Sequence, residues 1–159
     1  MAEIKLIRVD YRLIHGQVAT KWTRVANAQK IVVVDDESSK NETMKTLLKL
    51  AAPQGMKCLV YSVERCIEKW NEKQFGEGTV MMVFKDIDSV YQCWKGGLRV
   101  DALQLGNVPN NGKRQVLYGE VHADEKELAE LKEMAEAGTD IEIHTIPEVG
   151  GVSFNKIVK

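Results

Sequence analysis

Short runs of apolar and β-branched residues alternate along the chain with segments whose apolar residues recur at helical spacing. The runs have the length of strands rather than of helices, and they cover residues 4–7, 30–36, 57–61, 79–84 and 101–106. Alternating strands and helices predict a mostly parallel sheet with helices on both faces, because each connection must cross the sheet before the next parallel strand begins. No linker, repeat or low-complexity stretch interrupts the pattern, so we expect residues 1–159 to form a single three-layer α/β domain.

Polar residues mark where the helices between these strands should begin. The segment Ser39 to Glu42 has the S-x-x-E form of a capping box. It predicts a helix whose core-facing stripe, at the spacing i, i+3, i+4 and i+7, is Met44, Leu47, Leu48 and Ala51. Ser62, Asp86 and Asp124 are expected to begin the next three helices. Shorter strands are expected at residues 115–118, with an extension toward residue 121, and at 140–146.

Three polar side chains with complementary chemistry fall between the first strand and the first helix. Asp10, Arg12 and His15 lie in a predicted loop over residues 8–18. This loop precedes a helical stripe formed by Val18, Trp22 and Val25. In open α/β sheets, loops of this kind open at the carboxyl ends of the strands, where ligands bind.

The three side chains suit a phosphoryl group carried on histidine. A neutral imidazole is a nucleophile near pH 7, and a phosphoryl group on it brings close to two negative charges. Arg12 offers a planar fork of donors for that charge, while Gly16 lets the backbone approach closely. Asp10 is expected to hold either Arg12 or the imidazole in place. From spacing alone, a plain surface histidine beside an Asp–Arg pair stands as the alternative.

The segment Asp10-Tyr11-Arg12-Leu13-Ile14-His15-Gly16-Gln17-Val18, followed by Trp22, resembles a known active-site signature. It is the signature of the EIIB subunits of the mannose/fructose/sorbose class of bacterial sugar phosphotransferase systems. Weaker similarity extends along the chain at residues 33–36, 50–53, 84–85, 106–107 and 147. The resemblance implies a sheet of about seven strands, six of them parallel. The chain departs from the family pattern at residues 105–109, where relatives often carry a Gly-Gly pair.

The same resemblance implies a function. His15 would carry a transient phosphohistidine on Nδ1, with Arg12 and Asp10 as the other active-site residues. The EIIA protein would load it, and it would be discharged to a sugar bound by the membrane subunits EIIC and EIID. The chain would then be a protein-phosphohistidine–sugar phosphotransferase in the cytoplasm, held at the inner face of the membrane by EIIC and EIID. Because the membrane subunits select the sugar, the sequence does not identify it.

Five further residues are candidates for contact with the phosphoryl group, because they lie in the first loop or follow a neighbouring strand. They are Gly16, Gln17, Asp35, Lys85 and Asn107. A plainer interpretation stands beside each of the last three. An aspartate after a strand commonly caps the next helix, a surface lysine is commonly only solvated, and asparagine is common in turns.

Composition and motifs exclude several classes of function. The 22 basic residues nearly balance the 23 acidic ones, which argues against nucleic acid as a partner. No apolar run approaches the ~20 residues of a membrane-spanning helix, and the first residues lack a signal-peptide pattern. Three cysteines without a Cys-x-x-Cys pair, together with two isolated histidines, indicate neither disulfides nor a metal site, and no cofactor is expected; these are Cys58, Cys66, Cys93, His122 and His144.

Two alternatives to a phosphocarrier are a receiver-like domain phosphorylated on aspartate and a nucleotide-binding α/β signalling domain. A receiver would carry its acidic pair after the first strand, whereas Asp35 and Asp36 follow the second. The first loop holds one glycine, Gly16, and lacks both nucleotide-binding glycine patterns. Apolar residues in the tail, 148–159, favour either docking of the tail within the chain or a homodimer.

Overall fold

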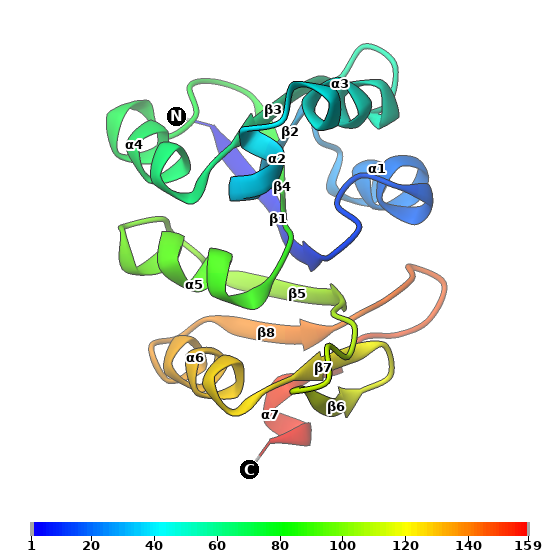
Figure 1. Ribbon diagram of the computed structural model, residues 1–159, viewed down its shortest axis with the longest axis vertical. Coiled ribbons are helices and arrows are strands. Elements are labelled where there is room, and N and C mark those ends of the chain that lie inside the picture. The colour runs from blue at the N-terminus through cyan, green and yellow to red at the C-terminus, as the bar shows by residue number, and fades with distance from the viewer. Residues whose placement is uncertain (1, 159) are drawn as a thin grey trace.

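A seven-stranded sheet runs through the middle of the protein, as the computed structural model shows (Figure 1). The strand order is β3-β2-β4-β1-β5-β8-β9; only β9 is antiparallel to its neighbour. The bounds are β1 Glu3–Asp10, β2 Lys30–Val34, β3 Lys57–Tyr61, β4 Thr79–Phe84, β5 Ala102–Asn107, β8 Asp140–Ile143 and β9 Val152–Ser153. The predicted α/β class and the mostly parallel sheet are confirmed. The structure describes residues 2–158; residues 1 and 159, the ends of the predicted domain, lie outside the described residues.

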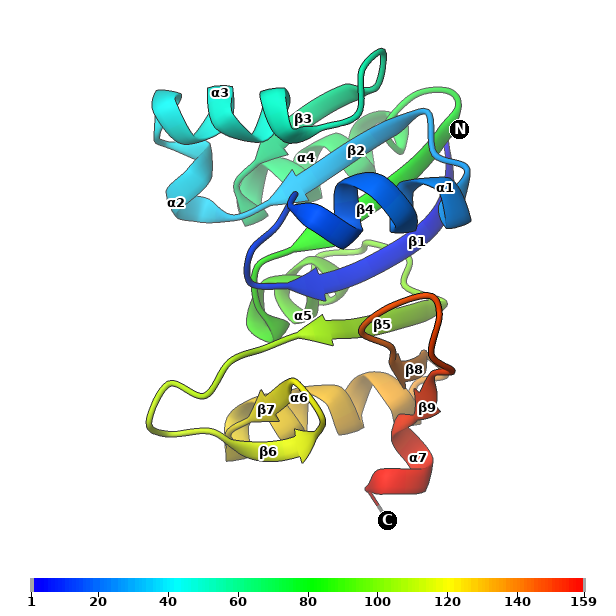
Figure 2. The ribbon, with the colours of Figure 1, turned by 90° about the vertical axis from the view of Figure 1, so that its right-hand side faces the viewer.

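Helices cover both faces of this sheet (Figures 1 and 2). One face carries α4 Val63–Lys73, α5 Ile87–Lys95 and α6 Glu125–Glu136. The other carries η1 Val18–Trp22, α1 Thr23–Ala26 and α3 Glu42–Ala51, while α2 Asp36–Ser39 and α7 Phe154–Ile157 are single turns. Within residues 2–158, no helix has both the length and the apolar character that crossing a bilayer requires.

The central strands are apolar at nearly every position because both of their faces are covered. Along β4, Val80 and Met82 pack into the core beneath α4 and α5, while Met81 and Val83 pack beneath η1, α1 and α3. All four are fully buried. Each such side chain contributes about 1.5–3 kcal/mol through burial. Continuous apolar runs are typical of parallel strands covered on both faces.

The first helix departs from the predicted spacing. Its first part is π-helical over Val18–Trp22, so an extra residue enters the turn. The buried positions therefore recur every four residues, at Val18, Trp22 and Ala26. The prediction that Val25 faces the core was wrong, since Val25 is 62% exposed.

The helix α3 begins and packs differently from the prediction. Asn41, not Ser39, is its N-cap, and the Asn41 side chain accepts from the Met44 N–H at 3.1 Å. Of the predicted stripe, Leu48 is buried and Met44 half-buried, but Leu47 and Ala51 are exposed. The reason is position, because α3 lies beside the outer strand β3 and reaches the sheet along a narrow line.

The other predicted helix starts are confirmed. The side chains of Ser62 and Asp86 each accept a hydrogen bond from a backbone N–H in the first turn of α4 and α5. Asp124 and Glu127 form a reciprocal capping box at the start of α6. These caps satisfy backbone donors that have no partner inside the helix.

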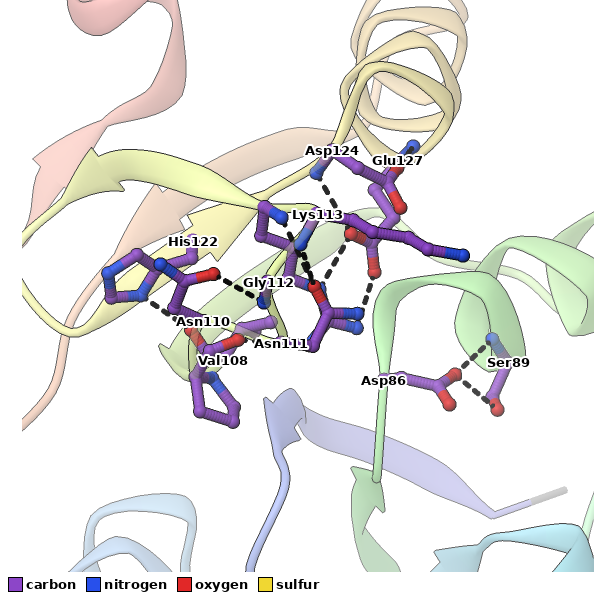
Figure 3. A network of polar contacts seen from close by, with 12 residues as sticks. Asp86, Ser89, Val108, Asn110, Asn111, Gly112, Lys113, His122, Asp124 and Glu127 are labelled. Atoms are coloured by element: carbon purple, nitrogen blue, oxygen red, sulfur yellow. Dashed lines mark hydrogen bonds and ion pairs between the residues drawn. The ribbon is translucent and has the colours of Figure 1, made fainter.

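A hairpin and a short tail complete the C-terminal half. The strands β6 Gln115–Tyr118 and β7 Val121–Ala123 pair antiparallel in a separate sheet, so the run predicted to extend toward residue 121 turns back at Gly119 and Glu120. The loop before this hairpin is held by the side chains of Asn110 and Asn111, which accept from backbone N–H groups (Figure 3). The strand predicted to end at residue 146 ends earlier, at Ile143. The tail docks within the chain through Phe154, which is buried.

Candidate active site

The loop that carries His15 leaves from the middle of the sheet, at the carboxyl edge (Figure 2). The strand β1 lies between β4 and β5, and Asp10 pairs with Asn107 at the end of β5. The sequence pattern predicted that this strand ends at residue 7, but in the structure it continues to Asp10. Asp10 is therefore fixed by the sheet, and only the residues after it form the loop.

A tight turn holds the start of this loop. The Leu13 N–H donates to the Asp10 carbonyl at 2.9 Å, and the Tyr11 N–H donates to the Asn107 carbonyl at 3.1 Å. Leu13 has a φ of 60°, in the left-handed region, which costs a bulky residue roughly 1–2 kcal/mol. The buried side chains of Leu13 and Ile14 in the core beneath the loop offset this strain. The turn thus sets the position of the residue that follows, His15.

His15 contacts Asp10 through one ring nitrogen. Its Nε2 lies 3.0 Å from Oδ1 of Asp10, which also accepts the Arg12 backbone N–H at 3.1 Å. An ionised carboxylate only accepts hydrogen bonds, so the contact places the hydrogen on Nε2 and leaves a lone pair on Nδ1. Nδ1 has no hydrogen-bond partner within residues 2–158. The imidazole is 17% exposed while the Asp10 side chain is 1% exposed, so the ring stands at the surface on a buried carboxylate.

Sequence reasoning missed a second charged partner of Asp10. Arg8 is 1% exposed, and its Nε and Nη2 approach Oδ2 of Asp10 at 3.4 and 3.3 Å. Burial lowers the pKa of the Arg8 guanidinium from its usual value, and Asp10 acts in the opposite direction. The available signal was an arginine directly after an apolar strand and two residues before an aspartate, a spacing that puts both side chains on one face of a strand.

Arg12 differs from Arg8 in every contact. Its side chain is exposed and makes no hydrogen bond or ion pair within residues 2–158. Only its backbone N–H bonds to Asp10. The sequence left open whether Asp10 holds Arg12 or the imidazole; the carboxylate contacts the imidazole, and the Arg12 guanidinium is unpaired in the described structure.

Gly16 and Gln17 follow His15 at the start of the helix. Gly16 is exposed, and a methyl group at its Cα would meet no atom within 4 Å. The half-buried Gln17 has a side-chain oxygen, Oε1, that is buried without a hydrogen-bond partner. Both residues follow the imidazole in sequence. No contact within the described residues explains why glycine stands at position 16 or why the Gln17 Oε1 is buried.

The remaining candidates divide into two places. Asn107 lies beside Asp10, and its carbonyl is bound by the loop. Asp35 and Lys85 lie at the ends of β2 and β4, where their side chains approach each other at 3.9 Å. Asp35 is also the N-cap of α2 and accepts from the Ser38 N–H and hydroxyl. No side-chain contact between described residues joins this pair to His15.

The other titratable candidates do not form a second centre. His122 Nδ1 lies 3.0 Å from the Val108 carbonyl, next to the β6–β7 hairpin (Figure 3). The His144 ring packs edge-on against Trp22, with 4.8 Å between ring centroids. Cys58, Cys66 and Cys93 are buried and form no disulfide, and no three metal-ligating side chains gather anywhere in residues 2–158.

Comparison with known proteins places the chain in a family. Residues 4–159 match the family model of the PTS system sorbose subfamily IIB component. The chain is 32% identical over 144 residues to the sorbose-specific EIIB component of the PTS system of Klebsiella pneumoniae, covering 91% of this chain and 88% of that protein. It is 35% identical over 144 residues to the mannose-specific EIIAB component of Escherichia coli K12, covering 90% of this chain but 44% of that protein.

A solved structure supports the same placement. The crystal structure of the IIBSor domain of the sorbose permease from Klebsiella pneumoniae matches with a TM-score of 0.91 at 30% identity, covering 98% of this chain and 96% of that one. The fold, the family match and the sequence relatives agree over almost the whole chain. The protein therefore belongs to the sorbose-subfamily IIB components, and it is an EIIB phosphotransferase component for sugar uptake in the mannose/sorbose class.

Proposed function

We propose that His15 is the residue that carries the phosphoryl group, and that Nδ1 is the accepting atom. The observation that supports this most directly is the contact between His15 Nε2 and the buried Asp10 carboxylate at 3.0 Å. It leaves Nδ1 as the nucleophile at the exposed edge of the sheet. During loading, the Nδ1–P bond forms while the donor's N–P bond breaks, and the electron pair of that bond returns to the donor.

Arg12 is the residue we assign to the phosphoryl oxygens. An exposed guanidinium without a partner is free to swing toward incoming charge, and its planar fork can bind two oxygens at once. The backbone N–H groups of Gly16 and Gln17 follow His15 in sequence at the start of the helix, and we assign them the same role. Asn107 ends β5 and Lys85 follows β4, the two strands on either side of β1. Both are assigned a weaker, electrostatic part, with Asp35 orienting Lys85.

The partners follow from the class of the protein. We propose that a separate or fused EIIA protein donates the phosphoryl group, and that the sugar receives it while bound to the membrane subunits EIIC and EIID. The Escherichia coli relative named EIIAB supports the first part, because its name couples an A and a B component in one chain. Such a carrier works in the cytoplasm against the membrane. Phe154, Ile157 and Val158 of the tail pack within their own chain, and the homodimer stays a prediction.

Replacing His15 by alanine tests the assignment. We expect His15→Ala to abolish labelling by phosphoenolpyruvate and the upstream carrier proteins, since the accepting nitrogen is gone. The variant His122→Ala is the matched control and should keep full labelling, because the His122 ring contacts the Val108 carbonyl and no hydrogen bond or ion pair within residues 2–158 joins it to His15. Full labelling of His15→Ala would remove His15 from this role.

Chemical stability of the label separates this proposal from an aspartate receiver. Phosphohistidine survives alkali and is lost in acid, whereas an acyl phosphate is lost in alkali as well. The acidic pair also argues against a receiver, because Asp35 caps α2 and Asp36 Oδ1 accepts the Val63 N–H at 2.8 Å. We therefore expect an alkali-stable label, and an alkali-labile one would favour the receiver.

A further inference from the structure

Arg8 occupies a place in β1 where an apolar side chain would be the ordinary choice. We propose that Arg8 is a positioning residue for phosphoryl transfer, because it fixes the Asp10 carboxylate that sets which nitrogen of His15 is nucleophilic. The proposal rests on the function proposed above for His15. Arg8 precedes Asp10 by two positions and His15 by seven. Its side chain contacts Asp10, and it acts on His15 only through that carboxylate.

The guanidinium of Arg8 is bound on all sides by the protein. Nη1 donates to Oε1 of Gln104 at 2.5 Å and to the His144 carbonyl at 2.7 Å, and Nη2 donates to the Thr145 carbonyl at 3.0 Å. The guanidinium also lies over the Trp22 ring, 4.9 Å from its centroid. Three separate segments, β5, the stretch after β8, and η1, therefore hold one side chain still.

Gly106 shows that β5 leaves room for this arginine. A Cβ at position 106 would collide with the guanidinium carbon and nitrogens of Arg8. The φ of Gly106 is not in the left-handed region, so backbone conformation does not require glycine there. Space for Arg8 is the reason that this position takes no side chain.

The fixed guanidinium determines the orientation of the Asp10 carboxylate. Both donors that face Asp10 approach Oδ2, which leaves Oδ1 for His15 Nε2 and the Arg12 N–H. Without the fork of Arg8, Oδ2 would lose both donors, and Oδ1 would no longer be held in line with Nε2. The ring hydrogen could then occupy Nδ1 instead, and the lone pair needed for transfer would be lost.

The C-terminal segment is part of the same arrangement. Thr145 offers one carbonyl to Arg8 and to Nε1 of Trp22, the latter at 3.2 Å. Glu148 in this segment pairs with Lys21 on η1. The stretch after β8 thus closes over Arg8 and ties it to the helix that follows His15.

The experiment measures the tautomer of His15 and the rate of labelling in the same proteins. Nitrogen-15 NMR of the unphosphorylated wild type should show the hydrogen on Nε2. In Arg8→Lys, which keeps a charge but not the fork, and in Gly106→Ala, which displaces the guanidinium, we expect a share of the Nδ1–H form to appear. The labelling rate should fall on the order of 100-fold, the effect typical of an ~1 Å misplacement. Arg99→Lys, at an exposed arginine paired with Asp101, is the matched control and should change neither readout.

Each outcome decides the matter. A wild-type His15 with its hydrogen on Nδ1 would overturn the proposal whether or not the variants fold. Folded Arg8→Lys and Gly106→Ala proteins with the wild-type tautomer and rate would overturn it as well. The tautomer is measured without any phosphoryl donor, so the two proposals can fail separately. If the wild type were not labelled on His15 but the variants still shifted its tautomer, the proposed function would fail while the effect of Arg8 on His15 would stand.

Discussion

Buried acids on the two faces of the sheet differ in what surrounds them. On the face covered by η1 and α1, Asp10 accepts from Arg8 at one oxygen and from His15 and a backbone N–H at the other. On the opposite face, Glu130 of α6 is 5% exposed, and no hydrogen-bond donor of the described residues reaches either of its side-chain oxygens. The titratable group that affects it most is another acid, Asp88 of α5.

The difference shows how a buried carboxyl is used. Burial, and then the hydrogen bond to Asp88 and its negative charge, raise the pKa of Glu130 to about 8. A proton on Glu130 makes it a donor to Asp88, whose own pKa is lowered by that hydrogen bond. Glu130 therefore holds a proton near neutral pH, whereas the Asp10 carboxylate accepts hydrogen bonds from Arg8, from His15 and from a backbone N–H. An ionised acceptor can orient an imidazole, and a carboxyl that holds a proton cannot do so in the same way.

Removing the charge of Asp10 should break this contrast with the largest effect. In Asp10→Asn, the amide can present either its oxygen or its nitrogen to His15 Nε2, so the imidazole tautomer is no longer fixed. We expect the labelling rate to fall on the order of 100-fold or more. Because Arg8 loses its counter-charge in a buried place, we also expect a loss of about 3–5 kcal/mol in the free energy of unfolding. Rapid-quench labelling and urea unfolding measure the two effects.

The control for Asp10→Asn is an aspartate that pairs with an arginine at the surface. Asp101 contacts Arg99 at 2.9 Å with both side chains more than two-thirds exposed. Asp101→Asn should leave the labelling rate unchanged and alter stability by less than about 1 kcal/mol. If Asp10→Asn behaved like this control, the buried carboxylate would have no part in orienting His15.

Replacing the exposed Arg12 should lower the labelling rate less than replacing the buried Asp10. Its side chain has no partner within residues 2–158, so Arg12→Lys should leave the free energy of unfolding within about 0.5 kcal/mol of the wild type. Lysine keeps the charge but loses the bidentate fork toward the phosphoryl oxygens. The loss of a charge-assisted hydrogen bond, about 1.5–3 kcal/mol, corresponds to a transfer rate lower by roughly tenfold to a hundredfold. Unchanged transfer kinetics would take Arg12 out of the site.

Local patterns were enough to predict most of the fold. The continuous run at 79–84 matches β4 residue for residue, because a central strand covered on both faces must be apolar throughout. Ser62 and Asp86 were predictable as caps, since capping depends on residues only three apart. Asp10, Arg12 and His15 were predictable as neighbours because they lie within six residues of one another at the end of one strand. The sequence did not predict that Asp10 contacts the imidazole rather than the Arg12 guanidinium, because this contact depends on the turn at Leu13.

Features that depend on distant segments were not predictable from local patterns. Arg8 was assigned to the loop because a charged residue ordinarily ends an apolar strand, yet Gln104 and two carbonyls after β8 make its burial possible. The exposure of Val25 follows from a π-helical turn that has no clear local signal. Acidic and basic residues surround Glu130 in the sequence, and such a pattern is typical of the solvent-exposed face of a helix. Only the packing of α6 against α5 buries it.

The smallest predicted effect on the labelling rate comes from the acid that holds a proton, which is expected to act on stability alone. The pKa of Glu130 is about 8 in the folded protein against an ordinary value of 4.5, so between these pH values the folded state binds more protons than the unfolded state. Stability therefore falls as pH rises through this window, by at most about 1.4 kcal/mol per pH unit.

The variant Glu130→Gln should flatten this slope, because an amide keeps a donor for Asp88 without titrating. Urea unfolding of both proteins at pH 5, 6, 7 and 8 measures the difference, with Glu136→Gln, at an exposed glutamate at the end of α6, as the control. The labelling rate of Glu130→Gln should match the wild type, since no contact joins Glu130 to His15. Equal slopes for the wild type and Glu130→Gln would mean that Glu130 is ionised in the folded protein. The contrast between a charged acid on one face and a protonated acid on the other would then be wrong.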